Sequence, residues 1–375
     1  MNRSKGITLN SLKIAVVHQS YWSERGQERL LKAVLELVPL AQLFLLFGDK
    51  ELIAQKLARD NVHFSWLQKL PFIKRFYRYT LPLWPLAYEM FDFKEYDLVI
   101  SLSSSFAKGV VTGPFTKHIS IITTPTRYLW DMSSEYYKAS DSIKKKVMKL
   151  FYTPLRIWDI LSARRPDKII AISNFIKQRI LKYYRIEAAT VIYPPVEYEA
   201  ISQKTLKKED FYIAISPFEE NKRGDLIIQL AQKTGIKIKL LGNGSQFKKL
   251  KAAAKGYPNI EFVGWVSDEA KHNLMKQAKG LIYPGIEDFG IVPVEAIYCG
   301  CPVLAFAQGG ALESVVDGKT GVFIYEQSVE ALEEGLERLK GLKFDLNMMQ
   351  ASVAKFAKSK FLNQFEQFIK SELRE

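Results

Sequence analysis

The sequence contains few of the residues on which disulfide and metal chemistry depend. Its 375 residues include only two cysteines and four histidines, and the two cysteines, Cys299 and Cys301, are separated by a single residue. Such a pair makes no disulfide framework, and a metal site would need more ligands than these two thiols. We expect both cysteines to pack at the end of a helix in a reducing, cytoplasmic environment.

Long apolar runs and the best-known nucleotide motif are also missing. No apolar stretch approaches the ~20 residues that a membrane-spanning helix needs, and the short polar start of the chain predicts no signal peptide. The first strand–loop–helix unit lacks G-x-G-x-x-G, so it is not a dinucleotide fingerprint.

Charge is abundant but unevenly distributed along the chain. The net charge is +14, with 30 Lys and Arg against 18 Asp and Glu in residues 1–200, and 24 against 22 in residues 201–375. A basic first half favours an anionic partner, such as lipid headgroups, nucleic acid or a phosphorylated acceptor. The alternative is a basic surface that serves solubility alone.

Buried strands alternate with amphipathic helices through both halves of the chain. A strand over residues 12–18, a glycine loop and a helix from about residue 28 to 38 open the first half, and a strand over 211–216 restarts the pattern. Pro194-Pro195 follows a strand and forms a stiff, extended joint. The pattern predicts an α/β protein with two doubly wound parallel sheets, in domains 1–195 and 196–349.

The stretch from Pro284 to Pro302 organises the rest of the sequence. Residues 280–283 predict a short buried strand, and Ile291 to Cys299 predict a helix with Pro293 in its first turn. A helix N-terminus has unpaired N–H groups and a partial positive charge, which suit a phosphate group. The candidate phosphate contacts at this junction are Phe289, Gly290, Ile291 and Val292.

Two glutamates flank this junction. Glu287 comes just before the helix, and Glu295 lies about one turn inside it. Either one alone is best interpreted as a solvated surface acid. Together, at a strand–helix junction, they predict that one carboxylate meets a sugar beyond the phosphates and that the other meets the ribose hydroxyls.

The run Glu287-Asp-Phe-Gly-Ile-Val-Pro-Val-Glu295-Ala296 resembles the hallmark of the family-4 retaining glycosyltransferases. These enzymes have the GT-B fold, in which two Rossmann-like domains face each other. The resemblance covers essentially the whole chain and is closest to mannosyltransferase-like members of surface polysaccharide pathways. It implies a C-terminal helix, over about residues 350–375, that crosses back to the first domain.

The resemblance also implies roles for single residues. Lys222 is expected to hold the diphosphate together with Arg223, although Pro217 replaces an arginine that relatives have. Glu287 would bind the sugar hydroxyls and Glu295 the ribose. Further donor contacts are expected at the loop glycine Gly26, at Gly242, and at the nucleobase-binding strand end Val266.

One expected site residue departs from the family pattern. Thr123 stands where mannosyl-transferring relatives carry a histidine over the donor sugar, so we expect it to donate one hydrogen bond to a sugar hydroxyl and no proton. Arg127 and Asp131 are candidates for substrate contacts, or else form an ordinary ion pair with each other. No D-x-D occurs, so no metal is implied.

The expected reaction moves a hexose, mannose from GDP-mannose, to a hydroxyl of a glycan or lipid-linked glycan, with retention of configuration. Another donor such as a UDP-sugar remains open, as do a GT-B phosphorylase or sugar-phosphate synthase. A non-catalytic binder of polyanions or membranes is a more distant alternative.

The segment 66–86 mixes aromatic and basic residues and has no acidic ones. It is consistent with helices that pack their aromatic side chains inward. It is equally typical of a face that contacts an anionic membrane, with aromatic rings at the headgroup level. The second interpretation predicts peripheral attachment to the inner face of the cell membrane.

Overall fold

The computed structural model describes residues 9–22, 26–138, 140–198 and 207–374. It divides the chain into two compact units, of which unit 1 comprises residues 1–195 and 359–375, and unit 2 comprises residues 196–358. Residues 23–25, which belong to the loop before Gly26, lie outside the described part.

Unit 1 is built on a seven-stranded parallel sheet with the order β3-β2-β1-β4-β5-β6-β7. The strands are β1 (Ile14–Tyr21), β2 (Gln42–Gly48), β3 (Val62–Phe64), β4 (Leu98–Ser103), β5 (Lys117–Ile122), β6 (Lys168–Ala171) and β7 (Thr190–Val191). The strand order reverses between β1 and β4, so the loops that follow these two strands diverge there. In open parallel sheets such a switch point, at the carboxyl ends of the strands, is where ligands bind.

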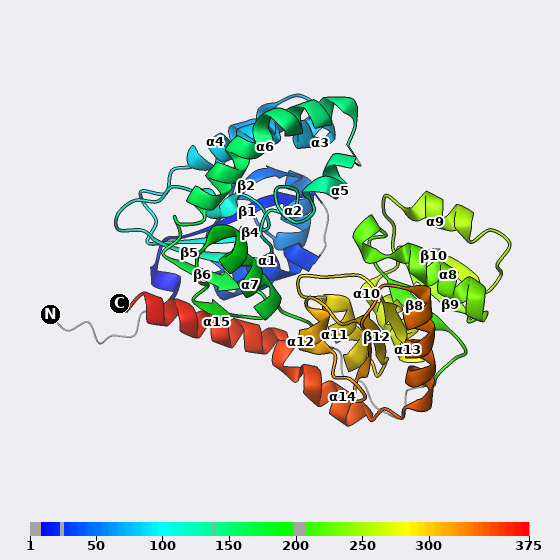
Figure 1. Ribbon diagram of the computed structural model, residues 1–375. Helices are drawn as coiled ribbons and strands as arrows, with labels where there is room; N and C mark the ends of the chain where they lie inside the picture. The colour runs from blue at the N-terminus through cyan, green and yellow to red at the C-terminus, as the bar shows by residue number, and fades with distance from the viewer. Residues whose placement is uncertain (1–8, 23–25, 139, 199–206, 375) are drawn as a thin grey trace. The chain divides into compact units, whose positions relative to one another are not determined.

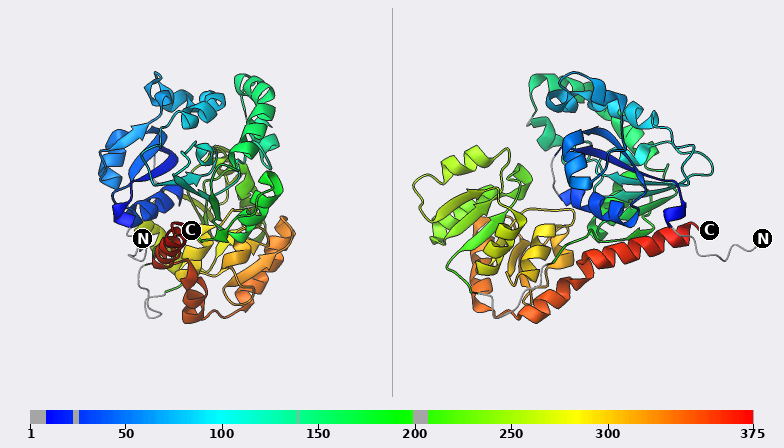
Figure 2. Two further views of the ribbon diagram at one scale, coloured as in Figure 1. Left: turned by 90° about the vertical axis from the view of Figure 1, so that its left-hand side faces the viewer. Right: turned by 180° about the vertical axis from the view of Figure 1, so that it is seen from behind.

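Helices cover both faces of this sheet (Figures 1 and 2). They are α1 (Gly26–Leu37), α2 (Lys50–Leu57), α3 (Ile73–Phe76), α4 (Trp84–Glu89), α5 (Ser133–Lys138), α6 (Ser142–Ser162) and α7 (Asn174–Tyr184). Ser173 caps the start of α7, because its side chain accepts a hydrogen bond from the Ile176 amide. Asp141 caps α6 in the same way through the Lys144 amide.

The C-terminal segment forms separate helices rather than one. The chain makes α14 (Leu346–Val353) in unit 2, a short turn at Ala354–Phe356, and then α15 (Lys358–Glu372). The break occurs because the backbone around Ala357 pairs with Val196, whose N–H donates to Phe356 O and whose carbonyl accepts from Lys358 N. The expected helix over residues 350–375 is therefore wrong in its first part.

Helix α15 belongs to unit 1, where it lies beside β6 and α7 (Figure 1). Phe361, Phe365 and Ile369 recur every four residues and are buried. At its end, the buried Glu372 carboxylate lies 3.3 Å from Lys117 Nζ and 3.2 Å from Lys168 Nζ. These two lysines begin β5 and β6, so one carboxylate connects the helix to two strands.

Unit 2 contains a six-stranded parallel sheet with the order β10-β9-β8-β11-β12-β13. Its strands are β8 (Tyr212–Ile215), β9 (Ile238–Leu241), β10 (Ile260–Gly264), β11 (Leu281–Tyr283), β12 (Val303–Phe306) and β13 (Gly321–Ile324). The helices between them are α8 (Gly224–Thr234), α9 (Phe247–Ala253), α10 (Asp268–Gln277), α11 (Ile291–Tyr298), α12 (Ala311–Ser314) and α13 (Val329–Gly341). The order reverses between β8 and β11, which makes the loops after these strands the switch-point loops of unit 2.

These two sheets confirm the predicted fold class, a pair of doubly wound parallel-sheet units. The cores follow from the sequence pattern, since continuous apolar strands are buried on both faces. In unit 2, Leu240, Ile282 and Leu304 from three strands pack with Leu230 and Leu336 from two helices. Both cysteines are buried and free of disulfides, as expected.

Candidate functional site

The two switch-point loops of unit 2 are joined by an ion pair. The Lys222 ammonium donates to Glu287 Oε1, although the residues come from the loops after β8 and β11. Lys222 is buried, and the Glu287 side chain is 21% exposed. The structure therefore brings together two residues that the sequence analysis assigned to one donor site from separate motifs.

The start of α11 presents free backbone donors beside this pair. Gly290, with φ of 84°, turns the chain from the β11 loop into the helix, a conformation that costs glycine little. Within the described residues, the N–H groups of Gly290, Ile291 and Val292 have no protein acceptor. All three residues are partly exposed, so a ligand oxygen can reach donors that the helix itself leaves unused.

The neighbouring residue, Phe289, is fixed by packing. Its side chain is buried and its ring stands edge-on to Phe356 with the centroids 5.2 Å apart. Gly310 N donates to Glu287 O over 2.8 Å, which holds the loop from the other side. The expected phosphate contacts thus divide into a structural part at Phe289 and an accessible part from Gly290 to Val292.

Glu295 is a buried acid inside α11 with a cation beside each of its oxygens. Lys271 Nζ lies 2.9 Å from Oε1 and 2.8 Å from Oε2, and His272 Nε2 lies 3.7 Å from Oε1. Both basic residues belong to α10, which follows the strand end expected to bind a nucleobase. A carboxylate held between these two side chains of α10 has a fixed orientation.

The remaining donor contacts expected in unit 2 lie at strand ends. Val266 follows β10, and within the described residues its N–H and carbonyl have no protein partner. Gly242 follows β9 with φ of 124°, and its N–H already donates to Gly264 O over 2.7 Å. The backbone N–H and carbonyl of Val266 are therefore available to a nucleobase, whereas the Gly242 N–H is already bonded to Gly264 O.

Arg223 has other partners. Its guanidinium donates to both carboxylate oxygens of Asp225 at 3.1 Å and to Gln327 Oε1 at 3.3 Å. The structure does not join it to Glu287, so a phosphate contact from Arg223 would require the exchange of these bonds.

Three expected residues belong to unit 1. Gly26 is exposed at the start of α1, beyond the carboxyl end of β1. Thr123 follows β5, and its hydroxyl donates to Ser103 O over 3.2 Å. A hydroxyl has one proton, so in this arrangement Thr123 would meet a sugar as an acceptor rather than as the expected donor. Arg127 is partly exposed in the turn that follows.

The suggested ion pair between Arg127 and Asp131 is wrong. Asp131 accepts both of its hydrogen bonds from Arg179 Nη2, each 2.7 Å long, and Arg179 Nη1 also donates to Thr124 Oγ1 at 3.0 Å. Arg179 comes from α7, about fifty residues away in sequence, so spacing alone gave no indication of the pairing.

Sequence reasoning gave no role to two further charged residues, Lys271 and Asp159. Lys271 resembles any lysine on a capped helix, and nothing in its local pattern marks it as a partner of Glu295. Asp159 is completely buried in α6. It does carry a sequence signal, because it is a lone acid at the helical spacing of Leu155 and Ser162, which are also buried.

No three His, Cys, Asp or Glu side chains in the described ranges converge on a position that could hold a metal ion. Likewise, none of the helices in the described part of the chain has the length and apolar character of a membrane span.

Comparison with known protein families assigns both units of the chain. Residues 44–200 match the model of Glycosyltransferase Family 4, and residues 197–356 match that of Glycosyl transferases group 1. The second match contains Lys222, Glu287 and Glu295, and the first contains Thr123 and Arg127.

Individual proteins agree with these matches. The alpha-1,3/1,6-mannosyltransferase of Dictyostelium discoideum is 27% identical over 223 residues, which is 47% of this chain and 53% of that protein. The enzyme of that name from Kluyveromyces lactis is 31% identical over 220 residues, covering 45% of this chain and 44% of its own length. The chain thus spans about half the length of these curated relatives.

A solved structure extends the likeness to the whole fold. Anabaena Alr3699/HepE, crystallised with UDP and glucose, superposes with a TM-score of 0.67 over 96% of this chain and 100% of its own, at 17% identity. At this identity the likeness concerns the fold.

Proposed function

The chain belongs to the family-4-like glycosyltransferases of the GT-B fold, and from this premise we propose that it moves a hexose from a nucleoside diphosphate sugar to a hydroxyl group with retention of anomeric configuration. The observation that carries the proposal is the meeting of Lys222 with Glu287 across the switch point of unit 2. Beside them lie the unused amides of Gly290, Ile291 and Val292.

These groups match the charge changes of the reaction. The transition state contains a cationic sugar ring and a diphosphate leaving group that gains negative charge. Fixed donors aimed at the leaving group lower the barrier most, and Lys222 with the three amides supplies them. The ammonium exchanges its bond to Glu287 for the diphosphate, which leaves the carboxylate for the sugar hydroxyls.

The nucleoside is held beside the residue one turn into α11. Glu295, oriented by Lys271, binds the ribose hydroxyls, and the backbone of Val266 meets the base. The leaving phosphate itself takes the proton of the acceptor hydroxyl. No metal or other cofactor has a role in this scheme, since a lysine and helix amides carry the diphosphate charge.

We assign mannose from GDP-mannose as the donor. The support is the match to two alpha-1,3/1,6-mannosyltransferases. The competing donor is a UDP-sugar, because the HepE structure of similar fold contains UDP and glucose. Recognition of a base through the main chain at Val266 is compatible with either nucleotide.

The acceptor is a glycan or a lipid-linked glycan. Thr123 and Arg127 of unit 1 are the residues proposed to contact sugar and acceptor, with the Thr123 hydroxyl as an acceptor of a hydrogen bond. A GT-B phosphorylase or sugar-phosphate synthase is the alternative, and it would require phosphate or a sugar phosphate as the second substrate.

The test is a transfer assay with GDP-mannose, UDP-glucose and ADP-glucose, each with a polyprenyl-linked glycan, followed by NMR of the product anomer. Transfer from GDP-mannose with a retained anomer supports the proposal in full. Transfer from UDP-glucose alone retains the enzyme class and overturns the donor. Turnover only in the presence of inorganic phosphate or a sugar phosphate favours the alternative.

A membrane surface is the proposed setting of the reaction. The predicted segment 66–86 continues through α4 to Met90, and residues 66–90 together combine inward packing with an exposed apolar edge: Trp84 and Tyr88 are buried, while Phe72 is 80% and Met90 63% exposed. The inward packing is therefore present for some of its aromatic side chains, and the exposed apolar edge supports the proposed membrane contact. Four basic residues of the segment are exposed: Lys69, Lys74, Arg75 and Arg78.

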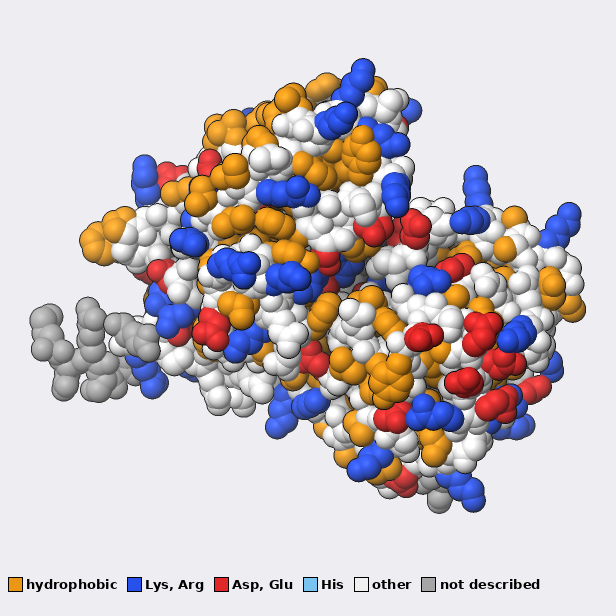
Figure 3. All heavy atoms as spheres, in the orientation of Figure 1, with side chains coloured by type: hydrophobic (Ala, Val, Ile, Leu, Met, Phe, Trp, Pro, Cys, Tyr) orange, Lys and Arg blue, Asp and Glu red, His pale blue; other side chains and the backbone are white. Residues whose placement is uncertain are grey.

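Helix α6 adds a second exposed strip next to this segment. Ile143, Leu150, Ile157 and Leu161 recur at helical spacing along α6 and are 54–69% exposed. Tyr79 OH donates to Asp141 at the α6 cap over 2.9 Å, which joins the strip to the segment 66–90. Figure 3 shows hydrophobic and basic side chains side by side on this part of unit 1.

Apolar side chains among lysines suit an anionic bilayer, where each cation adds about 1 kcal/mol. We propose peripheral binding to the inner face of the cell membrane through α6 and the segment 66–90. Co-sedimentation with phosphatidylglycerol vesicles, compared with phosphatidylcholine vesicles, tests this. Replacement of Lys145, Lys146 and Lys149 by Glu should abolish binding, whereas the same change at Lys248, Lys249 and Lys251 of α9 should not.

A non-catalytic polyanion binder is the remaining alternative. It predicts salt-sensitive binding to nucleic acid that is indifferent to Glu287→Ala and Lys222→Ala.

A further inference from the structure

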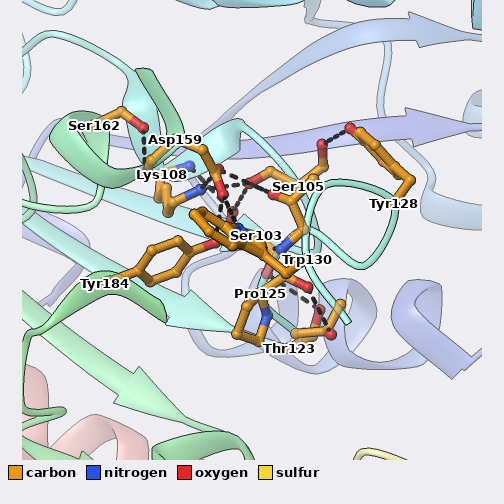
Figure 4. Close-up of polar contacts among 12 residues, drawn as sticks. Ser103, Ser105, Lys108, Thr123, Pro125, Tyr128, Trp130, Asp159, Ser162 and Tyr184 are labelled. Atoms are coloured by element: carbon orange, nitrogen blue, oxygen red, sulfur yellow. Dashed lines mark hydrogen bonds and ion pairs between the residues drawn. The ribbon is translucent and has the colours of Figure 1, made fainter. Parts of the chain in front are cut away.

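A charged pair lies completely buried beneath the turn that carries Arg127. Asp159 of α6 and Lys108, from the loop after β4, have no exposed surface, and Lys108 Nζ lies 2.5 Å from Asp159 Oδ1 (Figure 4). Lys108 Nζ also donates to Ser105 O over 2.8 Å. The proposed reaction uses neither residue directly, and burial of two charges needs an explanation.

The Asp159 carboxylate accepts hydrogen bonds on both oxygens. Oδ1 accepts from Lys108 Nζ and from Thr126 Oγ1 at 3.0 Å. Oδ2 accepts from Trp130 Nε1 at 2.8 Å and from Tyr184 OH at 3.0 Å. Four donors from three segments, the loop after β4, the turn that contains Thr126 and Trp130, and α7, thus converge on one carboxylate and occupy both of its oxygens.

Two of these donors, Thr126 and Trp130, are the ends of a single turn. The Leu129 and Trp130 amides donate to Thr126 O over 2.9 and 3.3 Å, and they close the turn. The Thr126 amide also donates to Tyr184 OH over 3.3 Å, so the tyrosine connects the turn to the carboxylate a second time. Figure 4 shows Trp130, Tyr184 and Lys108 directed toward Asp159.

Arg127 is the first residue after the fixed Thr126, and it is partly exposed. Thr126 and Trp130, the two ends of the turn, both donate to the buried Asp159 carboxylate. Asp159 therefore fixes the backbone of the turn and with it the direction of the Arg127 side chain. We propose that Asp159 is a positioning residue for sugar transfer, with Lys108 as its counterion, and that it acts by aiming Arg127 at the substrate. This inference rests on the proposed function, since it takes Arg127 to touch the substrate.

Stability alone does not account for the pair. Buried ion pairs are often replaced by apolar residues with no loss of stability, whereas removal of one partner is costly. The four hydrogen bonds to the Asp159 carboxylate fix the geometry of the groups that donate them, which apolar packing would not do.

The test uses Asp159→Asn. An asparagine has one acceptor oxygen instead of two. Its NH₂ group must therefore face either the donors Lys108 and Thr126 or the donor Trp130, and it cannot accept their hydrogen bonds. We expect faster hydrogen–deuterium exchange confined to the amides of residues 126–132 and a changed Trp130 emission. Unchanged exchange in this turn, or loss of protection spread evenly over unit 1, would overturn the proposal.

A double-mutant cycle with Arg127→Ala separates positioning from general damage. A misplaced contact group costs about a hundredfold, so both single variants should lose activity of that order in kcat/KM. If Asp159 acts through Arg127, Asp159→Asn should cost almost nothing in the Arg127→Ala background. Additive losses, or an Arg127→Ala variant as active as the wild type, would contradict it.

Tyr184→Phe provides a milder variant in case Asp159→Asn does not fold. It removes the one hydroxyl that bridges the Thr126 amide and Asp159 and keeps the aromatic packing. The expected result is a smaller loss of kcat/KM that also vanishes in the Arg127→Ala background. Failure of the proposed function looks different: no donor is then turned over by the wild type, while the exchange result at residues 126–132 still decides the role of Asp159 in the turn.

Discussion

Lys222 Nζ donates a hydrogen bond to Glu287 Oε1, and the two residues lie 65 positions apart in the sequence. The contact exists because β8 and β11 are neighbours in the sheet and their following loops leave the sheet side by side. The cation expected to hold the donor diphosphate is thus already joined to the acid expected to hold the donor sugar. In the proposed mechanism, donor binding replaces this one ion pair with two ligand contacts.

The first prediction concerns the acid. Glu287→Gln should keep nucleotide affinity within about threefold and lower kcat by about 10²–10³, because it weakens hydrogen bonds to the sugar in the transition state. Steady-state transfer kinetics and calorimetry with free nucleoside diphosphate measure the two quantities. Glu326→Gln, an exposed glutamate of the same unit, serves as the control and should match the wild type.

The second prediction concerns ribose recognition by Glu295. The wild type should bind GDP more tightly than 2′,3′-dideoxy-GDP by about tenfold, which is the value of one or two hydrogen bonds to a charged acceptor. Glu295→Gln should reduce that preference, and Lys271→Met should do the same by releasing the carboxylate. An unchanged preference in both variants would rule out a ribose contact at this residue.

The third prediction tests the packing behind the α11 amides. A Cβ added to Gly310 would lie 2.1 Å from Phe289 O, whereas one added to Gly341 meets nothing within 4 Å. Gly310→Ala should therefore destabilise unit 2 by about 1–3 kcal/mol and weaken nucleotide binding. Gly341→Ala should be neutral or slightly stabilising. Thermal unfolding with and without nucleotide compares the two.

The sequence predicted the elements of the site better than their contacts. Gly290, Pro293 and the apolar run before them specify a strand, a turn and a helix locally, and the structure has all three. To predict that Lys222 and Glu287 lie close together, it is enough to assume that they follow neighbouring strands of one sheet. Local patterns and the topology of parallel sheets are enough for such a prediction.

Contacts that depend on side-chain packing could not be predicted in this way. Asp131 pairs with Arg179 of α7 rather than with the nearby Arg127, because the rotation of α7 decides which residue faces the loop. Thr123 follows β5, and its single hydroxyl proton is already given to Ser103 O. Neither outcome is encoded in spacing.

The fourth prediction is a loss of stability in mild acid. Burial lowers the pKa of His18 and of His118 from 6.5 to about 4 in the folded protein. The unfolded chain therefore takes up protons first as the pH falls below 6.5, and stability decreases progressively until about pH 4. Each histidine contributes up to about 3 kcal/mol to this loss in the free energy of unfolding.

Urea unfolding at pH 7.5 and 5.0 measures the effect. Of the six tryptophans, all but Trp265 lie in unit 1, so tryptophan emission follows the unit that contains both histidines. His18→Leu should remove about half of the difference between the two pH values. A midpoint that is the same at both pH values would show that burial of these rings is not maintained.

The fifth prediction concerns the C-terminal helix. Glu372→Gln should destabilise unit 1 by about 1–3 kcal/mol, because Lys117 and Lys168 lose a buried charged partner. Glu366→Gln removes only a partly exposed pair with Lys370 and should cost at most about 0.5 kcal/mol. Equal effects in the two variants would contradict the role of Glu372 in holding α15 to β5 and β6.

Calorimetric titration of nucleoside diphosphates into the 375-residue chain tests the central claim most directly. The account predicts that GDP binds the wild type and that Lys222→Ala weakens this binding by at least about tenfold, the value of one charge-assisted phosphate contact. Lys233→Ala, on the same unit but paired with Glu333 on the surface, should bind as the wild type does. If no nucleoside diphosphate binds, or if Lys222→Ala binds as tightly as the wild type, then the diphosphate does not lie at the start of α11 and the account is wrong.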